Sequence, residues 1–144
     1  MHILVLVGAG ILTFLGVMHG LLTLRSTPTG GPMMPTDSSV QEAMSIEGGL
    51  GLAPEIRTTL WKAWIGFNLS HALGVVVVGV VIGWPVIRGM AVPADEVMWV
   101  AAALVLPWVY LGISSRYWFQ QPTAAIGLAG ALITGGIVGH WMLG

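Results

Sequence analysis

Residues 61–74 read W-K-A-W-I-G-F-N-L-S-H-A-L-G and open one of the most apolar stretches of the chain. They place an amide (Asn68), an imidazole (His71) and two indoles at the start of a long hydrophobic segment. This segment, residues 60–83, is long enough to cross a bilayer as a helix, which takes about 20 apolar residues. We therefore predict that residues 61–74 begin a membrane-spanning helix.

One half of this helix carries small and polar side chains. At about 100° per residue, seven positions share that half. They are Gly66, Phe67, Asn68, Ser70, His71, Gly74 and Val75. The other half includes Ala72 and Leu73. We predict that the first half packs against protein and that the second half faces lipid.

The composition is typical of a membrane protein. Of the 144 residues, 56% are hydrophobic and 8% are charged, whereas soluble domains carry roughly 25% charged residues. Four segments reach the length of a membrane span; they are residues 3–24, 60–83, 97–115 and 123–143. The predicted fold class is all-α, an integral membrane four-helix bundle with up-down-up-down topology that forms a single membrane domain, 1–144.

Small residues recur at helical spacing in the first and last of these segments. Gly16 and Gly20 are four residues apart in the first segment. The last segment has a longer ridge at the same spacing, formed by Thr123, Gly127, Ala131, Gly135 and Gly139. Such spacing allows two helix backbones to approach closely within lipid. We predict that both sets contact neighbouring helices.

The loop 25–59 is predicted to contain a short helix, about residues 38–47, that lies at the membrane surface or against a partner. Residues 35–39 offer several side-chain oxygens for its N-cap. Ser39 and Glu42 have the spacing of a capping box, and Pro54 suits the first turn of the following helix.

Other prolines are expected to mark helix ends or bends. Helix 60–83 should end at Gly83-Trp84-Pro85, and Pro107 should kink helix 97–115. Gln120-Gln121-Pro122 should form a tight turn before the last helix.

Basic residues predict the orientation of the bundle. Four of them lie on the side of the long loop, namely Arg25, Arg57, Lys62 and Arg116, and Arg88 lies alone on the other side. By the positive-inside rule, the loop 25–59 should be cytoplasmic and both termini should lie outside.

The histidines are the candidate cofactor ligands. His19 and His71 should lie at similar depth, whereas His2 and His140 should lie near the opposite surface. Paired imidazoles between facing helices could bind haem, and a single imidazole could bind a chlorophyll-type pigment. The glycines around His19 and His71 instead favour direct helix contact, in which His71 and Asn68 form hydrogen bonds across the bundle.

The residues give no catalytic signature. The chain has no cysteine, which excludes thiolate catalysis and cysteine-ligated metals. All Asp and Glu residues lie in loops or at helix starts, so no buried carboxylate is expected for acid–base chemistry. A net charge of −1 gives no indication of nucleic acid binding. We predict no catalytic residue and no metal site.

Three motifs resemble a known group of proteins. The stretch 61–74, together with G-V-M-H-G at 16–20 and P-T-D at 35–37, is similar to a family of small uncharacterised bacterial four-helix membrane proteins. The resemblance covers most of residues 1–80. It implies the fold and a bacterial plasma membrane, and it implies no activity.

The function expected from these features is that of a non-catalytic accessory or assembly subunit in a larger bioenergetic membrane complex, respiratory or photosynthetic. Its partners would be membrane lipids and other integral membrane subunits. Two alternatives remain open: a membrane redox protein that binds haem or pigment through its histidines, and a free-standing membrane protein.

Overall fold

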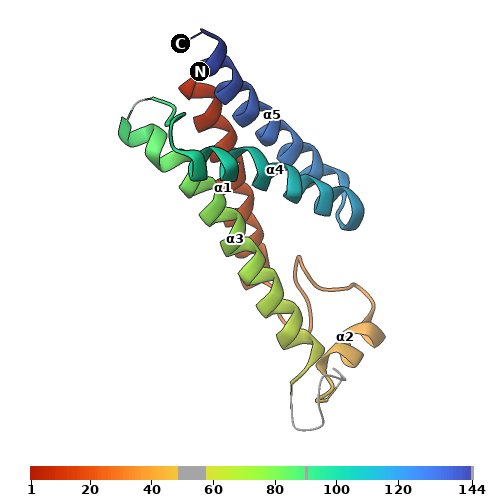
Figure 1. The fold of residues 1–144 in the computed structure, drawn as a ribbon. Helices are drawn as coiled ribbons and strands as arrows, with labels where there is room; N and C mark the ends of the chain where they lie inside the picture. Colours follow the sequence, from red (N-terminus) through yellow and green to blue (C-terminus); the bar gives the residue numbers. More distant parts are fainter. Residues whose placement is uncertain (49–57, 90, 144) are drawn as a thin grey trace. The chain divides into compact units, whose positions relative to one another are not determined.

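The computed structural model describes residues 1–48, 58–89 and 91–143. Within these residues the chain forms five helices, shown in Figure 1: α1 (His2–Leu24), α2 (Ser38–Ser45), α3 (Leu60–Gly89), α4 (Val97–Tyr117) and α5 (Gln120–Leu143). All except α2 are long and apolar enough to cross a membrane. The prediction of an all-α chain with four long apolar helices and one short helix is confirmed.

Helix α3 continues beyond its predicted end at residue 83 and includes Pro85. Proline lacks an amide hydrogen and disturbs the helical turn that precedes it. The indole Nε1 of Trp99 in α4 donates a hydrogen bond to the carbonyl oxygen of Ile82 in that turn, at 3.2 Å. This donor from another helix supports a turn that Pro85 weakens, and the helix ends only at Gly89.

Helix α5 begins at Gln120, where the sequence predicted a turn. Pro122 therefore lies in the first turn, where amide hydrogens have no partner within the helix and a proline costs little. Helix α4 likewise runs through Pro107, which is buried.

The N-cap of the short helix α2 lies within the predicted residues 35–39, but it is not the Ser39 of the capping-box spacing. Asp37 is the N-cap, and its Oδ1 accepts a hydrogen bond from the backbone amide of Ser39 at 2.8 Å. Ser39 is thus a donor to the cap rather than the cap itself. Pro54, which was expected in the first turn of the next long helix, lies outside the described residues. That helix is instead capped by Thr59, whose hydroxyl accepts from the amide of Lys62 at 3.1 Å.

Contacts between residues divide the chain into two units. The first comprises Met1–Leu15 and Gly74–Gly144, and the second comprises Gly16–Leu73. Helices α1 and α3 are each divided between the units: α1 after Leu15 and α3 after Leu73. We describe the units separately.

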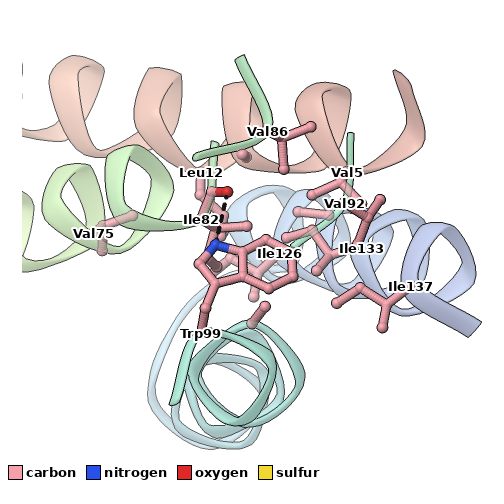
Figure 2. Close-up of a cluster of buried hydrophobic side chains, with 13 residues drawn as sticks. Val5, Leu12, Val75, Ile82, Val86, Val92, Trp99, Ile126, Ile133 and Ile137 are labelled. Carbon is pink, nitrogen blue, oxygen red and sulfur yellow. Dashed lines mark hydrogen bonds between the residues drawn. The ribbon is translucent and has the colours of Figure 1, made fainter. Parts of the chain in front are cut away.

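The core of the first unit takes buried apolar side chains from all four long helices. Figure 2 shows them around Trp99, whose indole lies beside α3. The buried members are Val5, Ala9, Leu12, Val75, Ile82, Val86, Val92, Trp99, Ala103, Ile126, Ala129, Ile133 and Ile137. Helices α4 and α5 form a hairpin within this unit (Figure 1).

Glycines let α1 lie directly against α3 and α5 in the first unit. A Cβ atom added at Gly79 of α3 would lie 2.8 Å from the carbonyl oxygen of Ala9 and 2.8 Å from the amide nitrogen of Thr13. A Cβ at Gly8 of α1 would lie 2.7 Å from the carbonyl oxygen of Ala129 in α5. Since these neighbours are backbone atoms, a side chain at either glycine would push the helices apart.

In the second unit, the loop after α1 is fastened to both helices. The hydroxyl of Ser26 donates to the carbonyl of Leu22 at 3.0 Å and accepts from the amide of Met33 at 2.9 Å. The indole of Trp64 in α3 donates to the carbonyl of Met33 at 3.1 Å. The side chain of Met34 is buried. The start of the loop is therefore held by specific hydrogen bonds as well as by apolar contact.

Candidate functional site

A cluster of polar side chains lies in the second unit, between α1 and α3. His19 Nε2 and Asn68 Oδ1 are 3.0 Å apart. The other atom of the same amide, Asn68 Nδ2, donates to the carbonyl of Trp64 at 2.8 Å. Because Nδ2 is the donor in that bond, Oδ1 is an acceptor, and His19 must carry its hydrogen on Nε2.

His71 lies beside His19 and comes from the other helix. The centres of the two rings are 5.5 Å apart, and their planes meet at 80°, an edge-to-face arrangement. Phe67, one turn earlier on α3, stacks on His71 with ring centres 6.3 Å apart and planes at 17°. Two imidazoles are therefore placed next to one another, one held by Asn68 and the other stacked on Phe67.

The backbones of α1 and α3 are close at this level. A Cβ atom at Gly20 would lie 3.5 Å from the Cβ of Ala72, and Gly16 is buried. The hydroxyl of Thr23 donates to the carbonyl of His19 at 2.8 Å, a bond that threonine commonly forms within a helix. The close approach predicted for Gly16 and Gly20 thus accompanies the histidine pair.

The inward face of α3 in this unit is rotated relative to the prediction. Ala72, predicted to face lipid, is 4% exposed, whereas Phe67, predicted to face protein, is 65% exposed. Gly66 is exposed, and a Cβ there would meet no described atom within 4 Å. Ser70 is also exposed, and its hydroxyl bonds to the carbonyl of Phe67 in its own helix. The prediction for Ala72 is wrong because Gly20, a residue without a side chain, leaves room for its methyl group.

The remaining predicted packing residues belong to the first unit. A Cβ at Gly74 would lie 3.1 Å from the hydroxyl of Tyr110. On α5, a Cβ at Gly127 would lie 3.5 Å from Leu111 of α4, and one at Gly139 would lie 2.6 Å from the sulfur of Met1.

The middle of the α5 ridge behaves differently. Ala131 and Gly135 are both exposed, and a Cβ at Gly135 would meet no described atom within 4 Å. Within the described residues, the ridge therefore meets Leu111 of α4 at Gly127 and Met1 at Gly139, and it is open at Gly135.

The histidine pair can form hydrogen bonds or ligate a metal, but it has no carboxylate on its own helices, because α1 and α3 contain no Asp or Glu. Among the described residues, no group of three or more His, Cys, Asp or Glu side chains is placed to hold a metal ion. An ion at the pair would thus have two ligands from the part of the chain that the structure describes.

A haem between His19 and His71 does not fit this geometry. With metal–nitrogen bonds of about 2.0–2.1 Å, two imidazoles on opposite sides of one ion have ring centres about 6.4 Å apart. The observed separation is 5.5 Å, with an edge-to-face arrangement, and α1 meets α3 at Gly20 and Ala72. A porphyrin would need a slot between these helices. A chlorophyll-type pigment on a single imidazole stays a prediction.

Sequence reasoning missed two parts of this region. It did not predict the hydrogen bond from Trp64 to Met33, since a backbone carbonyl in an irregular loop has no sequence signal. It also did not single out Ala72, which only the partner glycine on α1 makes an inward residue. Two signals in the sequence did indicate this region: the four-residue spacing of Gly16 and Gly20, and the polar Asn68 in an apolar segment.

Comparison of the chain with protein-family models, with curated proteins and with solved structures gives no match. The resemblance of residues 61–74 to a family of small bacterial membrane proteins therefore stays a prediction.

Proposed function

We propose that this chain is a multi-pass protein of the bacterial plasma membrane whose four long helices cross the bilayer in an up-down-up-down bundle. The length and hydropathy of these helices support it. So does the contact of Met1 with Gly139, because an even number of crossings brings the start of α1 and the end of α5 to one side. The basic residues favour a cytoplasmic long loop and external termini.

In that membrane, we propose that the chain is a non-catalytic accessory or assembly subunit of a larger complex, of the respiratory or photosynthetic kind. The observation that carries this proposal is the contrast between two sides of α5. One side is fully packed in the first unit; its buried residues are Ile126, Ala129, Gly130, Ile133, Gly136 and Ile137. The other side exposes Ala131 and Gly135.

The exposed side of α5 has the shape of a helix-docking surface. Ala131 and Gly135 are one turn apart, and the larger side chains of Leu128 and Val138 beside them are also exposed. Small residues four apart let a second helix approach closely in a bilayer, where van der Waals packing replaces the hydrophobic effect. A transmembrane helix of another subunit would fill this surface.

The absence of carboxylates from the long helices supports a non-catalytic role. None of α1, α3, α4 and α5 contains Asp or Glu. Acid–base catalysis and ion coupling within a membrane usually depend on such groups. Helix contact is then the activity that the surface of this chain supports best.

The test is native electrophoresis of membranes solubilised in mild detergent, with the wild type compared with Gly135→Leu. We expect the wild type to migrate with a large complex and Gly135→Leu to leave it, because the leucine fills the space between Leu128 and Val138. Gly112→Leu on α4 is the matched control, since Gly112 is also exposed, with no described atom within 4 Å of an added Cβ.

Two outcomes would count against the proposal. The first is a wild-type band at the 15.1 kDa of the lone chain in every mild detergent. The second is a purified dimer that Gly135→Leu dissociates, which would assign the surface to a second copy of this chain. Equal loss of the complex in Gly112→Leu would show that the effect is not specific to α5.

A further inference from the structure

We draw no further inference here: the strongest candidate, the surface pair of Trp108 in α4 and Thr134 in α5, whose indole and hydroxyl are hydrogen-bonded at 3.1 Å beside Gly135, belongs to the surface of α5 already described, and nothing in the structure shows which partner group covers it.

Discussion

In the first unit α1 meets α3 backbone to backbone at a glycine, whereas in the second unit a hydrogen bond between side chains also joins these two helices. Gly79 brings α3 against the backbone of α1; Asn68 instead joins α3 to His19 of α1 through an amide. Backbone contact cannot adapt to an added atom, but a hydrogen-bonded contact can lose one bond and keep its packing. Mutations at these contacts should therefore change stability more in the first unit than in the second.

Gly79→Ala should give the largest loss of stability. The added methyl group would lie 2.8 Å from two backbone atoms of α1, so the helices must separate, at a cost of about 3 kcal/mol. Gly135→Ala is the control in the same unit, because it makes the same change in a helix interior with open space around it. It should gain up to about 1 kcal/mol from helix propensity. Reversible unfolding in mixed detergent micelles, followed by circular dichroism, measures both; equal effects would contradict the Gly79 contact.

Trp99→Phe should have the next largest effect. It keeps an aromatic ring in the core but removes the donor to the Ile82 carbonyl beside Pro85. The loss should be about 1.5 kcal/mol, the upper end of the net contribution of one hydrogen bond, because the Ile82 carbonyl is inside α3 and keeps its helical partner. The double variant Trp99→Phe/Pro85→Ala should recover part of it, because the amide of an alanine at position 85 would donate to the carbonyl of Val81, which lies in the same turn and has no helical donor while residue 85 is proline. If the second substitution restores nothing, Trp99 does not compensate for Pro85.

Asn68→Leu should weaken the second unit by about 1 kcal/mol, the usual scale for a hydrogen bond between membrane helices. The readout is a disulfide between Gly20→Cys and Ala72→Cys in this cysteine-free chain, since a Cβ separation of 3.5 Å suits the bond. Crosslinking should form readily and should slow when Asn68→Leu is added. Ser70→Ala, which removes only a bond within α3, should leave the rate unchanged.

The smallest effect should come from Asp37. The hydroxyl of Ser39 and the backbone amides of Ser39 and Val40 lower the pKa of this carboxyl below its ordinary value. A lowered pKa means that the carboxylate stabilises α2 above the unfolded pKa, and that this contribution is lost as the pH falls through the folded value, below about pH 4.

Hydrogen exchange of the α2 amides, corrected for intrinsic rates, measures this loss. Protection should decrease in acid for the wild type and should not depend on pH in Asp37→Asn, which retains an acceptor but cannot titrate. The same pH dependence in both proteins would show that Asp37 is not the group responsible.

The parts of the fold that sequence could predict are those that depend on local pattern. Hydropathy located the long helices, and the Asp37–Ser39 region indicated a capped short helix. The end of α3 was misplaced because Pro85 is a valid local stop signal, and the donor that sustains the helix comes from Trp99, on another helix.

In the candidate site, too, features set by local pattern were predicted and features set by a second helix were not. Spacing identified His19 and His71 and placed them at similar depth, and the glycines indicated close helix contact there. The orientation of α3 could not be predicted, because the burial of Ala72 depends on Gly20 of α1 and not on any property of α3 alone. Gly79 and Gly8, which meet backbone atoms of other helices in the first unit, were not predicted either. Their contacts depend on those other helices and not on the sequence around each glycine.

The length of α3 has a consequence for the lipid around it. Lys62 and Arg88 stand near its two ends, about 39 Å apart at 1.5 Å per residue, whereas the hydrocarbon of a typical bilayer is about 30 Å thick. A helix that crosses such a bilayer with this mismatch must tilt by up to about 40° or draw its terminal charges toward the headgroups. Longer acyl chains would let α3 stand more upright, so membrane thickness would set the inclination of the element that carries Asn68 and His71.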